Sequence, residues 1–399
     1  MKVLHVLDHS LPRISGYSLR SEYIIRWQKR LGLHPVVVTS PEHQDFTDEC
    51  ERIDGIEFYR LHRPSFSSSS KIQTLPLVRQ LASEAAFSRE IRRLIEDQQI
   101  DLVHAHSPSL NGLAVARAAA EAGRPWIYEL RYCEEDAAVS RGEIRHNSLR
   151  YRVIQKLEQS CLDQAPCVVA ISTALRDELL RRGMAESRIF EVPQGVDPTL
   201  FQPRQPDPEL VGKYNLKGKT VIGFIGSTGP DDGLITLIDA ILLMLKEGRE
   251  VRALLVGGGQ AELWWEQIPR DWRDHFIYAG RVPHQEIDRY YSLMDVVVYS
   301  RLRSRETELT PPLNLLEAMA MERPVVSAGL DVIREWIRDG ETGYLIEEAD
   351  GGALAADLSR VIDDPARRTI GEQARAFALG QEWGPIVQRY LTVYERALK

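Results

Sequence analysis

The sequence predicts an α/β protein of two doubly wound domains, each built on a parallel β-sheet with helices on both faces. Short β-branched runs alternate with longer helical runs along the chain, which is typical of parallel sheets. The chain has 399 residues, more than one hydrophobic core usually serves. Residues 197–208 hold four prolines, and proline ends both helices and sheet ladders. We therefore expect a linker at 198–212 between a first domain at 1–197 and a second at 213–380.

The expected elements follow the hydrophobic pattern in chain order. Short runs of valine, isoleucine and leucine bounded by polar or glycine residues predict strands at 3–7, 34–39, 56–61, 102–105, 126–130, 167–171, 220–225, 251–256, 275–279, 296–299, 324–327 and 343–346. Longer segments with helical spacing predict helices in the first half at 19–31, 78–98, 112–122 and 151–164. The aromatic-rich segment 381–399 is expected to form a last helix.

Composition excludes several classes of protein. Apolar residues make up 43% of the chain and charged residues 27%, with a net charge of −8, so a nucleic-acid reader is not indicated. The four cysteines have no Cys-x-x-Cys spacing, which argues against a metal site or a disulfide framework and fits a reducing compartment. No run approaches the roughly 20 apolar residues that span a bilayer, so we expect a cytoplasmic protein. Residues 71–93 are the one candidate for peripheral membrane contact, although a domain helix is the simpler interpretation. Serines dominate 65–70, where we expect a loop.

Polar residues follow several strands of the first half. Gly16 lies between a strand and a helix, where backbone can approach a ligand, although simple turn chemistry explains it equally well. His104 and His106 share one side of a strand at its carboxyl end, where ligands of such sheets bind, although ordinary core or surface histidines would explain the pattern equally well. Glu129 and Arg131 follow the next strand. They could touch a substrate, with a solvated loop as the alternative.

The second half carries glycine-rich segments and acidic residues after its strands. Residues 223–233 and 255–260 read as turns suited to a pyrophosphate, but neither is a Walker motif. Glu308 precedes a Pro-Pro break. Glu317 then opens a helical run, where a carboxylate could hold sugar hydroxyls beside free helix N–H groups. An ordinary buried αβ unit would give the same local pattern.

Taken together, these motifs resemble the retaining GT-B glycosyltransferases of group 4. The resemblance rests on Pro-Gln-Gly-Val-Asp at 193–197, the glycine segments, Gly-Arg-Val-Pro-His at 280–284 and Leu-Leu-Glu-Ala-Met-Ala at 315–320. Within the group, Leu-His-Val-Leu-Asp-His-Ser-Leu-Pro at 4–12 is similar to glycosyltransferases of exosortase and exopolysaccharide clusters. The resemblance implies two Rossmann-like domains facing across a cleft, with the last helix crossing back to the first domain. It also implies a nucleotide-diphosphate-sugar donor, a carbohydrate or lipid-linked acceptor, retention at the anomeric carbon and no obligatory metal or other cofactor.

The resemblance also implies roles for particular residues. Glu317 would hold the ribose and Glu308 the transferred sugar, with His106 close to that sugar and Gly16 near the phosphates. Catalytic roles fall to His106, Glu308 and Arg305, and acceptor contacts to Glu129 and Arg131. The donor site as a whole would comprise Gly16, Ser227, Arg301, Arg303, Leu313, Asn314, Leu315 and Glu317.

The chain departs from the group at the loop that usually carries an Arg/Lys pair for the leaving diphosphate. Ser227 and Asp232 stand there instead. Arg301, Arg303 and Arg305 are the expected substitutes, with Arg281 a further candidate and plain solvation of the loop the alternative. Glu308 precedes Glu317 by nine residues where eight is usual, so Glu306 competes for its role. A catalytically silent nucleotide- or glycan-binding relative and a nucleotide-sugar epimerase stay open as alternative functions.

Overall fold

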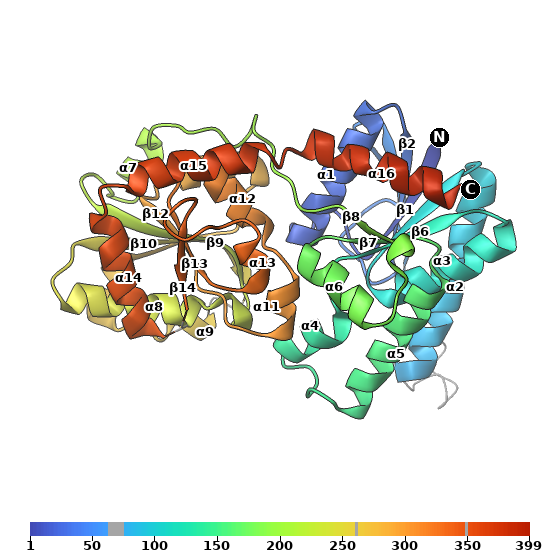
Figure 1. Ribbon diagram of the computed structural model, residues 1–399, viewed down its shortest axis with the longest axis horizontal. Coiled ribbons are helices and arrows are strands. Elements are labelled where there is room, and N and C mark those ends of the chain that lie inside the picture. Colours follow the sequence, from blue (N-terminus) through green and yellow to red (C-terminus); the bar gives the residue numbers. More distant parts are fainter. Residues whose placement is uncertain (63–75, 260–261, 348–349) are drawn as a thin grey trace. The chain divides into compact units, whose positions relative to one another are not determined.

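The computed structural model describes residues 1–62, 76–259, 262–347 and 350–399, which form two compact units (Figure 1). The first unit comprises Met1–Gln194 and Trp383–Lys399, and the second comprises Gly195–Glu382. The serine-rich segment 65–70 and the first part of the candidate membrane segment 71–93 lie outside the described residues.

The first unit contains a sheet of eight described strands in the order β3-β4-β2-β1-β5-β6-β7-β8, with β3 as its antiparallel edge. The strands are β1 Lys2–Leu7, β2 His34–Thr39, β3 Cys50–Ile53, β4 Ile56–Tyr59, β5 Leu102–His106, β6 Trp126–Leu130, β7 Val168–Ala170 and β8 Ile189–Glu191. Every residue of β5 and β6 is buried, as expected for central strands covered by helices on both faces.

The helices of the first unit are α1 Gly16–Arg30, α2 Pro76–Asp97, α3 Ser109–Ala122, α4 Glu134–Ser140, α5 Leu149–Gln164, α6 Thr173–Arg181 and α16 Trp383–Ala397. Helix α1 begins at a capping box in which Ser15 and Ser18 bond each other's backbone N–H groups. Helix α16 belongs to this unit although it comes after the whole second unit in the chain. It packs against α1, where Trp383 stacks on Tyr23 with ring centroids 5.1 Å apart.

The second unit contains a sheet of six described strands, all parallel, in the order β11-β10-β9-β12-β13-β14. They are β9 Thr220–Thr228, β10 Val251–Gly259, β11 Phe276–Gly280, β12 Val296–Tyr299, β13 Val325–Ala328 and β14 Tyr344–Ile346. Its helices are α7 Pro208–Lys213, α8 Leu234–Lys246, α9 Glu262–Trp265, α10 Ile287–Tyr291, α11 Arg305–Leu309, α12 Leu313–Ala320, α13 Asp331–Arg334, α14 Gly351–Asp363 and α15 Arg367–Leu379. Short 3-10 turns connect several of them.

The predicted fold class is confirmed, since both sheets are doubly wound and each predicted strand is present. The sequence did not predict β3, β8 or α4. The predicted glycine turns are wrong in part, because β9 and β10 continue through them and pair Gly257 with Gly226. The end of the predicted linker forms α7. Asp207 caps this helix and Pro208 occupies its first turn, where a backbone N–H would have no partner within the helix, so that proline is tolerated there.

Candidate functional site

Each sheet reverses its strand order at one place. In the first unit the chain moves outward from β1 to β2 and β4, and then continues on the other side of β1 with β5. In the second unit the corresponding reversal lies between β9 and β12. Loops at such a switch point separate and leave a crevice beyond the carboxyl ends of the strands, where α/β sheets bind ligands. We describe the two candidate half-sites separately.

Three histidines, all fully buried, cluster at the switch point of the first unit. His5 Nδ1 lies 3.1 Å from His106 Nε2, and His5 Nε2 lies 2.9 Å from the Gln28 side-chain oxygen. The Gln28 amide donates to the Tyr394 hydroxyl over 2.7 Å, and that hydroxyl lies 2.8 Å from His104 Nδ1. Side-chain hydrogen bonds therefore join α1 to β1 and α16 to β5.

A buried ion pair completes this chain of contacts. Arg131 donates to His106 Nδ1 over 2.8 Å and to Glu129 over 2.7 Å. Glu129 lies 3.5 Å from His104 Nε2. The seven residues thus form a closed circuit, which we call the buried ring: His5, Gln28, His104, His106, Glu129, Arg131 and Tyr394. Arg20 and Tyr390 also bond Glu129 from outside the ring.

The ring assigns one tautomer to each histidine. An arginine can only donate, so His106 Nδ1 accepts and its Nε2–H donates to His5. His5 then donates through Nε2 to Gln28, and Tyr394 donates to His104 Nδ1, which leaves the His104 Nε2–H facing Glu129. These contacts require His5 and His106 to be neutral, and they are compatible with a neutral His104.

Electrostatics agree with that assignment. Burial lowers the pKa of His5 to about 3 and also lowers the pKa values of His104 and His106. Burial acts to raise the pKa of Glu129, but Arg20 and Arg131 outweigh it and hold that pKa well below its ordinary value. The ring is therefore a neutral histidine cluster beside a charged carboxylate with two arginines.

The ring assigns Glu129 and Arg131 a structural part that the sequence did not predict. Glu129 is 0% exposed and Arg131 is 3% exposed, so the alternative of a solvated loop is wrong. The polar residues after β6 continue into α4 rather than into solvent. Contact of either residue with an acceptor stays a prediction. Gly16 is exposed as the first residue of α1.

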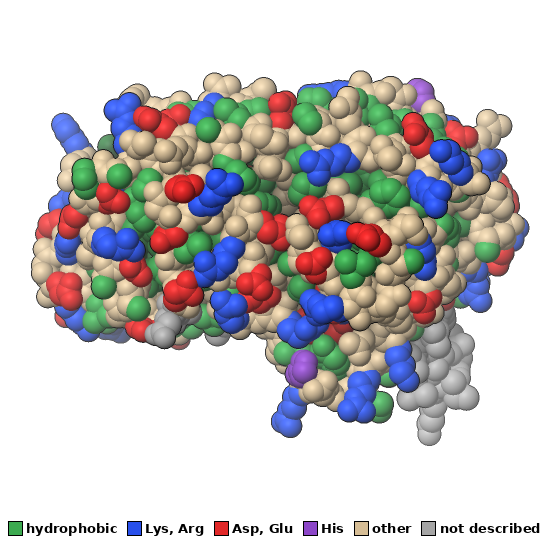
Figure 2. Space-filling view, viewed as in Figure 1, with side chains coloured by type: hydrophobic (Ala, Val, Ile, Leu, Met, Phe, Trp, Pro, Cys, Tyr) green, Lys and Arg blue, Asp and Glu red, His purple; other side chains and the backbone are tan. Residues whose placement is uncertain are grey.

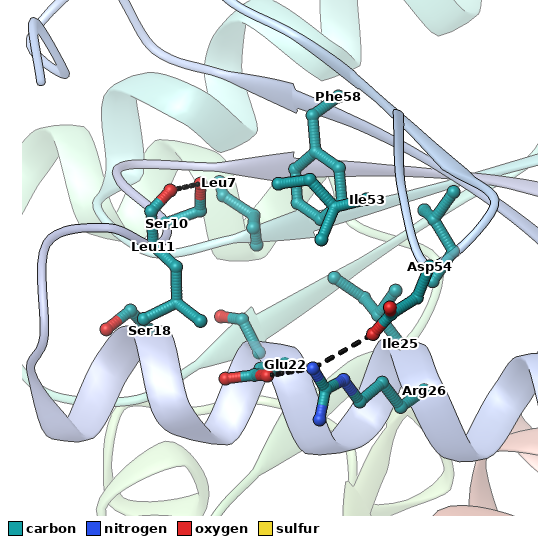
Figure 3. A pocket seen from close by; sticks show the side chains of 12 residues that line it. Leu7, Ser10, Leu11, Ser18, Glu22, Ile25, Arg26, Ile53, Asp54 and Phe58 are labelled. Atoms are coloured by element: carbon teal, nitrogen blue, oxygen red, sulfur yellow. Dashed lines mark hydrogen bonds and ion pairs between the residues drawn. The ribbon is translucent and has the colours of Figure 1, made fainter. Parts of the chain in front are cut away.

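A separate pocket of about 80 Å³ opens beside the end of β1, between α1 and the β3–β4 hairpin (Figure 3). At one side of it, Arg26 pairs with Glu22 at 2.7 Å and with Asp54 at 3.0 Å. Its walls are mainly apolar, formed by Leu7, Leu11, Ile25, Ile53, Ile56 and Phe58. Such a lining does not suit a diphosphate, and no predicted site residue lies in it.

In the second unit, Glu317 occupies the second turn of α12. The helix begins at Leu313, directly after the Pro-Pro break, so Glu317 does not open the helix as predicted. Glu317 is only 4% exposed, accepts a 3.1 Å hydrogen bond from the Tyr291 hydroxyl and lies 3.8 Å from His284. Burial raises its pKa to about 8. A buried carboxyl with one hydroxyl donor can accept further hydrogen bonds from ligand hydroxyls.

The first turn of α12 is fixed to the switch point. The Tyr299 hydroxyl donates to the Asn314 backbone carbonyl over 2.9 Å, and the Tyr291 hydroxyl oxygen lies 3.0 Å from the same carbonyl. The Asn314 side chain donates to the carbonyl of Ile225 in β9. Leu313 is 8% exposed and Leu315 is fully buried, so the Leu315 side chain belongs to the core.

Glycines let two strands and one arginine approach closely at this end of the sheet. Gly257 has φ +136°, and a Cβ on it would lie 1.8 Å from the Gly226 carbonyl oxygen. A Cβ on Gly258 would lie 2.1 Å from Arg281 Nε, so the exposed Arg281 side chain lies across this glycine. The absence of Cβ atoms is what permits this close packing of β9, β10 and Arg281.

The loop that carries Ser227 and Asp232 in place of the usual Arg/Lys pair is stabilised by hydrogen bonds to the Asp232 carboxylate. Asp232 accepts from the Ser227 hydroxyl over 2.7 Å and from the Gly229 backbone N–H over 2.9 Å. Arg301 lies nearby, with Nε 3.9 Å from an Asp232 oxygen, and donates over 2.8 Å to the Thr310 carbonyl. Asp232 thus acts as a local cap whose charge faces an arginine.

The other predicted cations lie farther along the same loop. Arg303 pairs with Glu308 and donates over 3.0 Å to the Gly329 carbonyl. Glu308 also accepts from the Asp331 backbone N–H over 2.7 Å. Arg305 is exposed at the start of α11, and Glu306 is half-buried beside it. Glu308 therefore has two protein partners, and which of the two acids meets a sugar stays open.

Sequence reasoning missed the residues that complete the buried ring. His5, Gln28 and Tyr394 lie within a strand and two helices, where the pattern indicates only core packing. One signal was available, since Tyr390 and Tyr394 are four residues apart and so share one face of the last helix. Nothing in the pattern showed that this face would meet histidines.

Two family models match the chain. Residues 15–195 match the glycosyl transferase 4-like domain, and residues 219–364 match the glycosyl transferases of group 1. The first match covers the first unit from α1 to β8, without β1, and the second match lies within the second unit and includes both strands of its switch point, β9 and β12. The fold and both matches define a GT-B glycosyltransferase.

Individual proteins agree with this class. The chain is 27% identical over 325 residues to a phosphatidyl-myo-inositol mannosyltransferase of Mycobacterium leprae, covering 78% of each. It is 25% identical over 402 residues to a GDP-mannose-dependent alpha-mannosyltransferase of Mycobacterium tuberculosis, covering 99% of this chain and 96% of the relative. Among solved structures, sucrose-phosphate synthase of Thermosynechococcus elongatus has a TM-score of 0.78 at 18% identity, with 99% of each chain covered. Anabaena HepE in complex with UDP-glucose has a TM-score of 0.74 at 20% identity, also with 99% of each chain covered. Over residues 15–195 and 219–364 the chain is thus similar to glycosyltransferases of the 4-like and group 1 families.

Proposed function

We propose that this protein transfers a sugar from a nucleotide-diphosphate donor to a carbohydrate or lipid-linked acceptor, with retention at the anomeric carbon and without an obligatory metal. The observation that carries the proposal is the buried Glu317 carboxyl of α12, a helix whose first turn bonds β9 through Asn314 at Ile225, next to the glycines of β9 and β10. A carboxyl at this depth with one protein donor suits the paired hydroxyls of a ribose. The glycines beside it suit a diphosphate, which needs close backbone approach.

The donor site would use the switch point of the second unit. Glu317 would bind the ribose, while Asn314 and the backbone of the first α12 turn would lie near the phosphates. The other residues expected in the donor site are Ser227, Arg301, Arg303, Leu313, Leu315 and the exposed Gly16 of the first unit. Because the usual Arg/Lys pair is missing, the diphosphate charge would be met by arginines of the loop after β12.

Catalysis would rest on stabilising the leaving diphosphate and positioning the acceptor. Arg305 would meet charge that grows in the transition state, Glu308 would bind the transferred sugar, and His106 would lie near that sugar. His106 would act as a neutral group, since its Nδ1 accepts from Arg131 in the buried ring. Glu129 and Arg131 would then affect the acceptor side by holding His106 and the β6 end in place.

The biological setting we propose is assembly of cell-surface or exopolysaccharide glycans in the cytoplasm, with peripheral contact at the inner membrane face. The setting is supported by the resemblance of residues 4–12 to glycosyltransferases of exosortase and exopolysaccharide clusters. The names of the two mannosyltransferase relatives and of the HepE complex make GDP-mannose and UDP-glucose the first donors to test.

Donor binding is tested by a thermal-shift screen against UDP, GDP, ADP and their common sugar conjugates, with EDTA or with magnesium. A ligand that binds only the folded state raises the midpoint by mass action. We expect one nucleotide series to raise it in EDTA, and Glu317→Gln to remove that shift. Glu322→Gln is the matched control, since Glu322 follows the same helix and pairs at the surface with Arg375 at 3.7 Å. If no nucleotide shifts the midpoint, the donor site is wrong.

Turnover and stereochemistry need a second assay with the donor identified above. NMR of the anomeric proton in early product distinguishes retention from inversion. We expect Arg305→Ala to lower kcat by about 100-fold, the usual effect of removing one transition-state contact, with donor affinity nearly unchanged. Arg338→Ala, at an 80% exposed side chain in the same unit, is the control. Loss of donor affinity with normal turnover would exclude this role for Arg305.

A silent binding relative is the second candidate function, and one observation favours it. The loop that normally carries the cation pair is closed by Asp232, which bonds Ser227 and Gly229. Such a protein would bind nucleotide or glycan as a partner subunit and form no product. A nucleotide-sugar epimerase would instead convert the donor without any acceptor, which the same NMR experiment detects.

A further inference from the structure

The turn between α4 and α5 and the exposed face of α5 carry an unusual combination of side chains. Residues 141–156 hold five arginines or lysines and one glutamate, in a chain whose net charge is −8. Leu149 is 81% exposed and Val153 is 41% exposed. We call this the basic–apolar surface, formed by Arg145, Leu149, Arg150, Arg152, Val153 and Lys156.

Helical spacing brings most of these residues onto one face. Leu149, Arg152, Val153 and Lys156 stand at i, i+3, i+4 and i+7 of α5, so they are neighbours on the helix surface. All four are exposed. Positive side chains gather over the end of the first unit where α4 and α5 lie (Figures 1 and 2). Two apolar side chains are thus surrounded by cations.

The cations of this surface are not used in structural ion pairs. Among the described residues, Arg145, Arg150, Arg152 and Lys156 have no salt bridge, whereas the neighbouring Arg141 pairs with Glu143 at 2.7 Å. In α2 and α6, by contrast, Arg92 pairs with Glu96 and Arg176 pairs with Glu186. Unpaired cations around an exposed leucine favour an anionic partner with an apolar layer beneath it.

The surface is also held rigid from behind. Tyr151 is 4% exposed, and its hydroxyl donates over 2.8 Å to Asp136 of α4. The Ser148 hydroxyl caps α5 by accepting from the Tyr151 backbone N–H. Leu149 is therefore presented by an anchored helix start. Burying it in a partner would cost little ordering of the backbone.

We propose that the basic–apolar surface docks the first unit onto a bilayer that contains anionic lipids. Leu149 and Val153 would enter the boundary between headgroups and acyl chains, as apolar residues of interfacial helices do. The four cations would meet lipid phosphates, each strengthening binding by about 5-fold, which corresponds to about 1 kcal/mol. In the described residues no helix has the length and apolarity to cross a bilayer, so attachment through this surface is peripheral. The inference rests on the proposed function in one respect, that a lipid-linked acceptor would lie in such a bilayer.

Vesicle co-sedimentation of the full chain tests the proposal. The vesicles are phosphatidylcholine alone or a 3:1 mixture of phosphatidylcholine and phosphatidylglycerol, at low and physiological salt. We expect binding to the mixed vesicles only, weakening as salt rises because surface charges are screened. Leu149→Ser should lower the partition coefficient by roughly tenfold, as loss of most of a buried leucine predicts. Arg150→Gln with Arg152→Gln should lower it by about 25-fold.

Matched controls separate this surface from general effects. Leu379→Ser removes a 41% exposed leucine of α15 in the second unit, and Arg338→Gln removes an exposed cation there; neither should alter vesicle binding. No sedimentation with mixed vesicles would overturn the proposal and leave an acidic protein as the fitting partner. Equal binding by Leu149→Ser and the unaltered chain would also overturn it. Vesicle binding needs no sugar donor, so its failure is distinguishable from failure of nucleotide binding in the thermal-shift screen.

Discussion

Glu317 should make the stability of this protein fall as pH rises. Burial raises its folded pKa to about 8 from an ordinary value of 4.5. The folded state therefore holds a proton that the unfolded state has released between these values. By linkage, stability decreases with pH across that window. Glu317→Gln keeps the shape of the protonated side chain and removes the titration.

The expected size follows from the two pKa values. Between pH 5 and pH 9 there are about 3 pH units over which the folded state binds one proton that the unfolded state does not. At 1.36 kcal/mol per pH unit, the free energy of unfolding therefore falls by about 4 kcal/mol. We expect urea unfolding of the full chain to be similar for both proteins at pH 5, and Glu317→Gln to be more stable by up to this amount at pH 9. Parallel stability curves at all pH values would show that Glu317 is ionised in the folded protein.

Three further predictions concern the buried ring and the glycine strands. Tyr394→Phe leaves buried atoms of Gln28 and His104 without partners and should cost about 2–4 kcal/mol, measured by the denaturant midpoint. A loss below about 0.5 kcal/mol would mean that water or a shifted side chain replaces the hydroxyl. The ring histidines have lowered pKa values in the folded protein, so the stability that they contribute is present above about pH 6.5 and is lost as pH falls toward their folded pKa values. Acid unfolding followed by circular dichroism measures this loss. A chain as stable at pH 4 as at pH 7 would contradict the prediction. Gly257→Ala should destabilise the second unit and remove donor binding, because its Cβ would lie 1.8 Å from a carbonyl oxygen. Gly212→Ala is the control and should be neutral, since a Cβ there would meet nothing within 4 Å. Equal denaturant midpoints for the two variants would refute the close approach at Gly257.

Elements with a strong hydrophobic pattern could be predicted from the sequence, and those fixed by tertiary contacts could not. The central strands are continuous β-branched runs, because both of their faces are buried. Strand β8 has only three residues, and β3 is an edge strand with mostly exposed positions, so neither carries a comparable pattern. The segment Glu134–Ser140 begins with three acids and resembles a solvated loop, but two of those acids are buried in α4.

The residues of the candidate site likewise divide into those that a local sequence motif reveals and those that tertiary contacts determine. Glu317 and the glycine strands could be found because a local motif marks them. The position of Glu129 at the centre of an ion-pair network could not be found, since its partners lie 109 positions earlier at Arg20 and 261 positions later at Tyr390. Side-chain partners so far apart in sequence are set by strand order, which a single sequence does not reveal.

The membership of α16 in the first unit has a consequence for biosynthesis. Tyr390 and Tyr394 complete the contacts of the buried ring, yet the ribosome must first make the whole second unit, Gly195–Glu382. At about 5–20 residues per second this takes roughly 10–40 s. During that interval the nascent first unit has three histidines and an ion pair without their final cover. We expect it to stay sensitive to proteases until α16 emerges, so that the second unit begins to fold beside a neighbour that is still incomplete.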